Sequence, residues 1–401
     1  MTLLPVAEAL ARVTEGAKPG PAESVPLHEA AGRVLAAPLR ALRTQPPFDA
    51  SAMDGYAVRA TDVAASSARL RVVGEAPAGK LFPGKVQPGE AVRIFTGAPV
   101  PEGADTILIQ ENARKLDGGA IETTVPVSPG KHIRRRGLDF VEGEELLEAG
   151  RLLDPAALSL AASANHPALN VIKRPRIAII ATGDELLPPG SKTGPDQIIS
   201  SNAYGVAAVA KSVGAEAIDL GIAPDHRDAI ASRVRQALDA SVDVIVTLGG
   251  ASVGDHDLVH DVLADEGMAL DFWKIAMRPG KPLMFGRLGS TRILGLPGNP
   301  VASLVCSHLF LKPLLARLGG LPHEPDMRDA VLGATMPAND QRQDYVRATT
   351  RDSDGRLVAT PFHIQDSSML RTLADSNALI VREPGAPAAD AGAHCRVLFL
   401  R

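Results

Sequence analysis

The chain has 401 residues, of which 45% are hydrophobic and 22% charged, and this length and composition predict a globular protein of several domains. The net charge of −4 argues against nonspecific nucleic-acid binding, and no run of about 18 apolar residues is present to cross a membrane. Only Cys306 and Cys395 are present, which excludes a disulfide framework, and the N-terminus lacks a signal-peptide pattern, so we expect a cytoplasmic protein.

The first part of the chain combines two short helices with a β-rich stretch. Apolar residues recur at helical spacing over residues 5–13, which predicts an opening helix. Residues 25–140 read as short β pieces broken by glycine and proline. A second helix is predicted over 154–164, because Asp154 is a good N-cap and Pro155 suits the first helical position. We expect the two helices to pack together, so that residues 25–140 are an insertion into a helical stem.

From residue 174 the pattern changes to alternating strands and helices. This rhythm predicts a mostly parallel sheet covered by helices on both faces. After a proline-rich joint, the last part of the chain returns to strands and predicts a small β-domain. The expected strands are 176–182, 216–221, 243–248, 270–276 and 292–296, and the expected helices are 202–213, 227–239, 256–265 and 299–318.

Residues 242–257, VDVIVTLGGASVGDHD, are the most informative stretch. A buried strand leads into a glycine-rich loop, and glycines such as Gly249, Gly250 and Gly254 let backbone N–H groups approach a phosphate. The adjacent carboxylates of Asp255 and Asp257 would repel an anion, which indicates a divalent cation between them and the ligand. An ordinary strand–turn–helix corner capped by aspartate is the alternative interpretation.

Charged residues also follow the other predicted strands of this segment. Ligands of parallel α/β sheets bind beyond the carboxyl ends of the strands, so these side chains are expected to converge on one site. Carboxylates suit Mg²⁺, and lysines and arginines neutralise phosphate or another oxyanion. The expected carboxylates are Asp184, Glu185, Asp225, Asp255 and Asp257, and the expected cations are Lys274, Arg278 and Lys281.

Seven separated motifs resemble one family over nearly the whole chain. They have the order and spacing of the molybdopterin molybdotransferases, the MoeA-type enzymes related to the E domain of gephyrin. The ATGDEL and LGGASVGDHD motifs alone would also fit the related adenylating enzymes. The motifs are SAMDGYAV (51–58), IFTGAPVP (94–101), RRRGLD (134–139), ATGDEL (181–186), LGGASVGDHD (248–257), FWKIAMRPGKP (272–282) and GLPGNPV (295–301).

The resemblance implies a multidomain α/β plus β fold. Its expected parts are a helical stem (1–24 with 141–172), an inserted β-rich domain (25–140), a parallel-sheet molybdopterin-binding domain (173–322) and a C-terminal β-barrel (323–401). It also implies a homodimer in which the α/β domain of one chain faces the β-rich insertion of the other.

The implied reaction takes adenylated molybdopterin and molybdate, requires Mg²⁺, and releases AMP and molybdenum cofactor. An oxo group of molybdate or a water attacks the phosphate, and no general base is assigned. Further partners implied by the pathway are the molybdopterin adenylyltransferase and recipient molybdoenzymes.

The motifs also carry over site residues one by one. Glu185, Asp225 and Asp257 match metal-binding acidic positions, and Asp54, Thr96, Asp139 and Lys274 complete the catalytic set. The substrate-binding set is Gly249, Gly250, Ser252, Gly254, Arg278, Lys281, Pro297, Pro300, Arg347, Ser367 and Ser368.

Two positions depart from the family pattern. Arg278 stands where many members have lysine, which changes the geometry offered to an oxyanion because arginine is planar and bidentate. Leu138 stands where an acidic residue is common, so Asp139 is expected to be less strongly coupled to its surroundings. Three alternatives stay open: a molybdopterin adenylyltransferase, a non-catalytic pterin-binding scaffold, and an enzyme that uses tungstate.

Overall fold

The computed structural model describes residues 3–249, 258–353 and 355–400. The chain divides into two compact units, which are treated separately below. Unit 1 comprises Met1–Glu23, Gly32–Val34 and Ile172–Arg401, and unit 2 comprises Ser24–Ala31 and Leu35–Val171. The four domain boundaries expected from the sequence stay a prediction.

A six-stranded sheet forms the centre of unit 1. Four neighbouring strands are parallel, and β20 runs antiparallel to both β21 and β18. As a result, β18 points the same way as the parallel strands, and its carboxyl end lies at the same edge of the sheet. In spatial order the strands are β16 (Glu216–Ala223), β13 (Arg176–Thr182), β17 (Val244–Leu248), β21 (Thr291–Leu296), β20 (Pro282–Leu288) and β18 (Ala269–Lys274).

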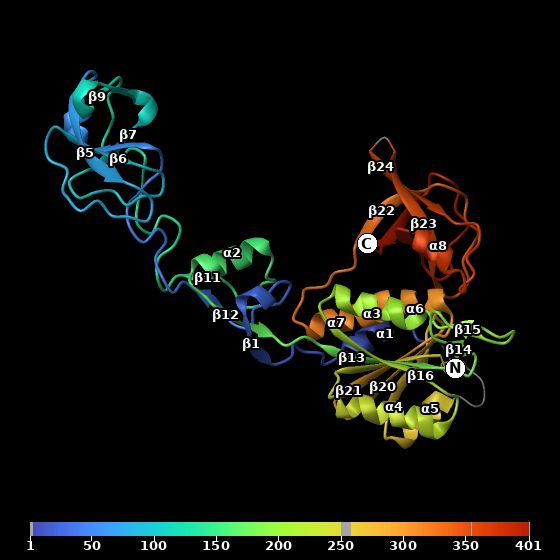
Figure 1. The fold of residues 1–401 in the computed structure, drawn as a ribbon. Coiled ribbons are helices and arrows are strands. Elements are labelled where there is room, and N and C mark those ends of the chain that lie inside the picture. The colour runs from blue at the N-terminus through green and yellow to red at the C-terminus, as the bar shows by residue number, and fades with distance from the viewer. Residues whose placement is uncertain (1–2, 250–257, 354, 401) are drawn as a thin grey trace. The chain divides into compact units, whose positions relative to one another are not determined.

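Helices cover both faces of this sheet, as expected (Figure 1). Helices α4 and α5 pack on one face, and the other helices pack on the opposite face, where Phe285 and Phe310 are fully buried. The helices are α1 (Val6–Thr14), α3 (Asn202–Ser212), α4 (Arg227–Asp239), α5 (Leu258–Asp265), α6 (Pro300–Cys306), a π-helical turn (Ser307–Leu311) and α7 (Lys312–Leu318). The predicted strands and helices of this segment are therefore confirmed where they are described, with β20 as an addition, while residues 256 and 257 of the predicted helix 256–265 lie outside the described residues.

The expected packing of the opening helix is wrong. The apolar face of α1, formed by Val6, Ala9 and Val13, belongs to the same buried cluster as the sheet and α7. Helix α2 (Pro155–Ser163) lies in unit 2 and buries Ala157 and Ala161 in a different cluster. An amphipathic pattern predicts that a face is buried, but it does not identify the partner.

One long helix of unit 1 is strongly apolar. The continuous helix Pro300–Leu318 is apolar and long enough to cross a membrane by length and composition alone. However, 67% of its most apolar window is buried inside the structure, where Val301, Val305 and Leu314 contribute to the core. It is built as a core helix.

The last part of unit 1 is a closed five-stranded β-barrel, which confirms the expected C-terminal domain. The strands follow the order β23–β24–β22–β26–β25, and a further pairing of β23 with β25 closes the barrel. Strand β19 (Met277–Arg278) pairs with β23. The remaining elements are β22 (Met327–Leu332), β23 (Gln343–Ser353), β24 (Arg356–Pro361), α8 (Leu370–Asp375), β25 (Ala378–Arg382) and β26 (His394–Phe399), with a small pair β14 (Leu186–Leu187) and β15 (Ile198–Ile199).

Unit 2 is β-rich, as the sequence predicts. Its six-stranded sheet has the order β7–β4–β6–β5–β9–β8, and helix α2 begins with Asp154, whose carboxylate accepts from the Ala157 N–H at 2.8 Å. The sheet strands are β4 (Gly55–Val58), β5 (Arg69–Ala76), β6 (Glu90–Ile94), β7 (Thr106–Ile109), β8 (Ala113–Lys115) and β9 (Ala120–Thr123). Shorter strands are β1 (Ala22–Pro26), β2 (Leu39–Arg40), β3 (Ala50–Ser51), β10 (Ile133–Arg134), β11 (Glu145–Leu147) and β12 (Ala168–Ile172).

Candidate active site

Three carboxylates gather beyond the carboxyl ends of β13 and β16. The Asp225 N–H donates to Oδ1 of Asp184 at 3.0 Å, which ties the two loops together. Burial raises the pKa of Asp225 above its usual range, and the negative charges of Asp184 and Glu185 raise it further. The parallel register of β13 and β16 therefore produces the acidic group that the sequence predicts.

This acidic group lacks a protein counterion within the part of the chain that the structure describes. The nearby Arg227 pairs instead with Asp261 and Asp265. Among the described residues, no three carboxylate, imidazole or thiol groups stand in a geometry that holds a metal ion. The third predicted ligand, Asp257, lies outside the described residues, as does Asp255.

Closely approaching backbone segments form the floor beside this group. Gly249 has a φ of +91°, and a Cβ there would lie 2.8 Å from the carbonyl oxygen of Thr182. A Cβ on Gly298 would meet the Cα of Gly249 at 3.7 Å. The ends of β13, β17 and β21 therefore approach one another closely, and the Gly249 N–H donates to the Leu296 carbonyl oxygen at 3.4 Å. The predicted residues Gly250, Ser252 and Gly254 lie outside the described residues.

Two buried hydroxyl groups lie under this floor. Oγ1 of Thr182 and Oγ1 of Thr247 are buried and have no hydrogen-bond partner among the described residues. Buried polar groups are nearly always paired with protein, water or ligand. Their position on β13 and β17 indicates that a polar group completes this edge of the sheet.

The N-terminus of α6 is linked to the barrel by the loop that carries Ser367. Nδ2 of Asn299 donates to Oγ of Ser367 at 2.8 Å, and the Val301 N–H donates to its carbonyl oxygen at 3.0 Å. Pro297 is buried at the end of β21, and Pro300 occupies the first position of the helix. The helix begins with partial positive charge next to a serine hydroxyl, which favours an anion.

Arg347 on β23 is buried next to this loop. Its side chain is only 1% exposed, and burial lowers its pKa. Nε donates to Oε1 of Gln365 at 3.1 Å, and Nη1 donates to the carbonyl oxygen of Asp366 at 2.8 Å. Arg347 makes no ion pair with a described residue, and its hydrogen-bond acceptors are neutral, although the negative charges of Asp366 and Asp344 lie near enough to favour its charged form. The neighbouring Ser368 donates its hydroxyl to Oδ1 of Asp366 at 2.6 Å.

The three predicted cations near β18 differ in their environment. Lys274 and Lys281 are exposed and form no ion pair with a described residue. Arg278 instead donates to Asp344, which raises its pKa, and lies 3.5 Å from Asp340. The positive charge of Arg278 is therefore largely neutralised by the barrel, whereas neither lysine is paired with a carboxylate of the residues that the structure describes.

Three predicted site residues, Asp54, Thr96 and Asp139, belong to unit 2. Oδ1 of Asp54 accepts from both the N–H and the hydroxyl of Thr96, each at 2.8 Å. Both hydrogen bonds lower the pKa of Asp54, and the one from the Thr96 backbone N–H contributes most. The exposed Asp139 is held through its backbone N–H, which donates to Gln45 at 3.0 Å.

Sequence reasoning missed three residues that shape the site. Gln365 holds Arg347, Asn299 holds Ser367, and Asn202 donates to the carbonyl oxygen of Gly298 at 2.8 Å. Asn299 lies inside the quoted motif GLPGNPV, and Gln365 precedes the predicted Ser367, but the hydrogen bonds of both residues join separate segments of the chain. Only the fold reveals these pairs.

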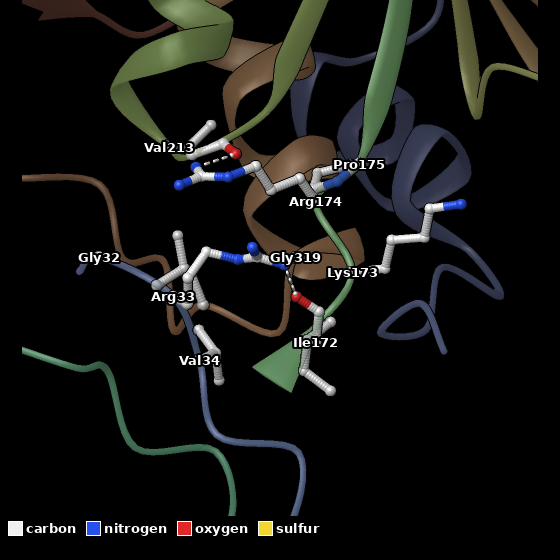
Figure 2. A pocket seen from close by; sticks show the side chains of 11 residues that line it. Gly32, Arg33, Val34, Ile172, Lys173, Arg174, Pro175, Val213 and Gly319 are labelled. Atoms are coloured by element: carbon white, nitrogen blue, oxygen red, sulfur yellow. Dashed lines mark hydrogen bonds between the residues drawn. The ribbon is translucent and has the colours of Figure 1, made fainter. Parts of the chain in front are cut away.

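A small cavity elsewhere in unit 1 does not compete with this site. Arg33 and Arg174 line it, and Figure 2 shows both side chains in the space beside Ile172, with Arg33 donating to the Ile172 carbonyl oxygen at 2.9 Å. Its volume of about 10 Å³ holds roughly one water molecule. This space is too small to be a binding site for a substrate.

The fold defines a class of protein: a multidomain α/β protein with a mostly parallel sheet and a C-terminal β-barrel. Three family models match successive parts of the chain. The MoeA N-terminal region (domain I and II) matches residues 4–165, the probable molybdopterin binding domain matches 178–317, and the MoeA C-terminal region (domain IV) matches 329–400.

Relatives and solved structures agree with these models along the full chain. The molybdopterin molybdenumtransferase of Bacillus subtilis is 34% identical over 409 residues, covering 100% of this chain and 95% of its own. The protein of that name from Nostoc sp. is 38% identical over 391 residues, covering 94% of this chain and 88% of its own. The crystal structure of the molybdopterin biosynthesis MoeA protein from Pyrococcus horikoshii superposes with a TM-score of 0.84 at 28% identity, covering 100% of both chains. The chain belongs to the MoeA family.

Proposed function

We propose that this protein is a molybdopterin molybdotransferase, which inserts molybdate into adenylated molybdopterin and releases AMP. Full-length relatives carry that activity in their names. The observation that supports it most directly is Arg347, a buried guanidinium without an ion pair among the described residues, next to Ser367 and the start of α6. A tetrahedral dianion suits such a pocket.

The described residues divide between two tasks. Arg347, Ser367 and Ser368 border the proposed oxyanion pocket. Gly249 and Gly298, which carry no side chains, leave room beyond the strand ends for the phosphates of the pterin nucleotide. Lys274 and Lys281, which have no carboxylate partner among the described residues, offset the charge of those phosphates during transfer. Lys281 is therefore better suited than Arg278 to neutralise an anionic ligand, because Arg278 is paired with Asp344.

Mg²⁺ is proposed as the cofactor, held by Glu185 and Asp225 together with Asp257. The fit rests on the raised pKa of Asp225, because crowded carboxylates without a protein cation are electrostatically suited to a divalent ion. When bound, the ion would neutralise the phosphoanhydride and polarise its phosphorus. Mg²⁺ commonly keeps several waters and takes further ligands from substrate phosphates, so two or three protein carboxylates would suffice to hold it.

The alternative activities are less well supported. An adenylyltransferase would share the α/β domain, but this chain also matches the MoeA N- and C-terminal regions. A non-catalytic scaffold would not require Asp225 and Glu185 to be held close together against their repulsion.

The decisive experiment follows AMP release when purified protein is incubated with adenylated molybdopterin, Mg²⁺ and micromolar molybdate or tungstate. Release that depends on molybdate supports the proposal, and the tungstate arm tests metal preference. Adenylation of free molybdopterin by ATP, without that release, would favour the adenylating enzyme. Pterin binding without either reaction would favour a scaffold.

A homodimer and a cytoplasmic location complete the proposal. Ile198, Ile199 and Tyr204 of unit 1 are 56%, 38% and 58% exposed, which supports contact with a second copy. Cys306 and Cys395 are buried free thiols, which suits a reducing compartment. Light scattering of the wild type and Tyr204→Glu tests the dimer. The molybdopterin adenylyltransferase and recipient molybdoenzymes are the proposed partners in substrate supply and product transfer.

A further inference from the structure

A second cavity in unit 1 shares no residue with the candidate active site. Its volume is about 220 Å³, large enough for a small organic molecule. Helix α1, the π-helical turn, α7, the joint before the barrel and strand β26 all contribute to its wall. Its lining residues are Leu10, His308, Leu309, Lys312, Pro313, His323, Glu324, Pro325, Asp326, Leu398, Phe399 and Leu400.

Three basic side chains meet in this cavity. His308 comes from the π-helical turn, Lys312 from the start of α7 and His323 from the joint. They are close enough that the charge of Lys312 lowers the pKa of both imidazoles, and His323 lowers that of His308. Burial is the larger cause for each histidine.

None of these three side chains has a hydrogen bond or ion pair with any residue that the structure describes. The ring nitrogens of His308 are not among the buried unpaired atoms, so they face accessible space. The π-helical turn matters here because one extra residue per turn interrupts the regular helix and displaces its side chains, and such turns are frequent at binding sites.

The carboxylates at the rim do not neutralise this basic group. Asp326 accepts two hydrogen bonds from Arg328, at 2.8 Å and 2.7 Å, so its negative charge is already paired with that arginine. Glu324 is exposed and forms no ion pair with a described residue. Lys312 therefore lacks a counterion within the described protein, and the lowered pKa values of His308 and His323 make these imidazoles neutral hydrogen-bonding groups at pH 7.

The cavity also has an apolar lining. Leu10, Leu309 and Phe399 line the space, and the guanidinium carbon of Arg328 lies 4.2 Å from the centroid of the Phe399 ring. A ligand that fits this lining needs both a negative group and an apolar body.

We propose that this cavity binds a small organic anion, with its carboxylate or phosphate group against Lys312, His308 and His323 and its apolar body against Leu10, Leu309 and Phe399. The site lies about 12 Å along the helix from the N-terminus of α6, at the ~1.5 Å rise per residue of an α-helix. It is therefore separate from the pocket for molybdate.

Calorimetric titration of the full-length protein tests this proposal with benzoate and phenyl phosphate as probes. At least one of them should bind at one site per chain with a Kd below about 1 mM. Benzyl alcohol, which keeps the ring without the charge, should bind at least about tenfold more weakly. Inorganic phosphate, which keeps the charge without the apolar body, should do the same.

Lys312→Met should weaken binding of the probe at least about tenfold, because it removes the positive charge of the lysine. The matched control Lys211→Met alters an exposed lysine of α3 and should leave the affinity unchanged. Leu10→Trp, which fills the cavity from α1, should block the probe without touching the basic group. All three variants should retain molybdate-dependent AMP release, so the outcome does not depend on the proposed activity.

Absence of binding by both aromatic anions would overturn the proposal. Unchanged affinity in Lys312→Met would equally overturn it, because binding would then occur elsewhere. If inorganic phosphate bound as tightly as phenyl phosphate, the proposed contact of the ligand with Leu10, Leu309 and Phe399 would be wrong.

Discussion

Gln365 and Arg347 bind each other reciprocally through side chain and backbone. Oε1 of Gln365 accepts from the Arg347 N–H at 3.0 Å and from its Nε at 3.1 Å, while its Nε2 donates to the Arg347 carbonyl oxygen at 3.0 Å. One carboxamide thus fixes both the backbone and the guanidinium of a buried arginine. Because the carboxamide is uncharged, it orients Arg347 without cancelling the positive charge that an oxyanion needs.

Gln365→Leu should therefore raise the KM for molybdate about ten- to hundredfold, since hydrogen bonds to charged groups contribute about 1.5–3 kcal/mol. The affinity for the adenylated pterin should change much less, because we assign the pterin phosphates to the space beside Gly249 and Gly298 and not to Arg347. Steady-state AMP release at varied molybdate measures the first quantity, and titration of the pterin measures the second.

Gln236→Leu provides the control, since this exposed glutamine lies on α4 and interacts with Arg233. It should leave both quantities unchanged. Equal losses of molybdate and pterin affinity in Gln365→Leu would show that the residue supports the fold generally and does not position Arg347 for an oxyanion.

Asp225→Asn should reduce the response of the protein to Mg²⁺. The substitution removes one of three crowded negative charges, so the ion loses a ligand and the metal-free fold loses repulsion. Added Mg²⁺ should raise the melting temperature of the wild type and have little effect on the variant, in scanning calorimetry. Asp239→Asn, at the end of the same helix that follows Asp225, should respond to Mg²⁺ as the wild type does. A full response in Asp225→Asn would contradict the metal site.

Much of the α/β architecture could be predicted because its signals are local. Strand β13 and helix α4 carry their own patterns of apolar residues, and the sharp glycine turns mark where strands end. Strand β20 was not predicted, because Gly286 and Arg287 interrupt its apolar run. The structure explains the glycine: a Cβ on Gly286 would lie 2.8 Å from the carbonyl oxygen of Ala269 on β18.

The clustering of Asp184, Glu185 and Asp225 could be predicted from the sequence, but the hydrogen bonds around the candidate site could not. Parallel strands bring Asp225 and Glu185 together by a general rule of such sheets. The pairing of Arg278 with Asp344 depends instead on β19 joining the barrel, and these residues are 66 positions apart. No local pattern contains that information, and the consequence is functional, because Arg278 is the cation that the structure neutralises.

Gly249→Ala should destabilise unit 1 and impair pterin binding together. The φ of +91° disfavours any side chain, and the new Cβ would lie 2.8 Å from the Thr182 carbonyl oxygen. We expect a loss of about 1–3 kcal/mol in the free energy of unfolding, measured by urea denaturation.

The matched substitution is Gly298→Ala, whose Cβ would make only an ordinary contact of 3.7 Å with Gly249. It should preserve the stability of unit 1 while reducing affinity for the adenylated pterin, because the Cβ enters the space between the strand ends. Wild-type pterin affinity in Gly298→Ala would show that the ligand does not approach this floor.

His308 should make the stability of unit 1 sensitive to acid. Burial, together with the charges of Lys312 and His323, lowers its pKa from 6.5 to about 4. In the window between these values the unfolded chain binds more protons than the folded one, so stability falls as the pH decreases. Glu324 and Asp326, the carboxylates of the cavity rim, are not among the groups that shift this pKa.

His308→Gln removes this titration while keeping a polar side chain of similar length. Relative to the variant, the wild type should lose on the order of 1.4 kcal/mol of unfolding free energy per pH unit between pH 6.5 and about 4, and nothing above that window. Urea denaturation at a series of pH values measures the difference. His363→Gln, an exposed histidine of the barrel domain, should follow the wild type throughout. Parallel curves for His308→Gln and the wild type would mean that His308 is already solvated or paired in solution, and its place in the cavity would have to be revised.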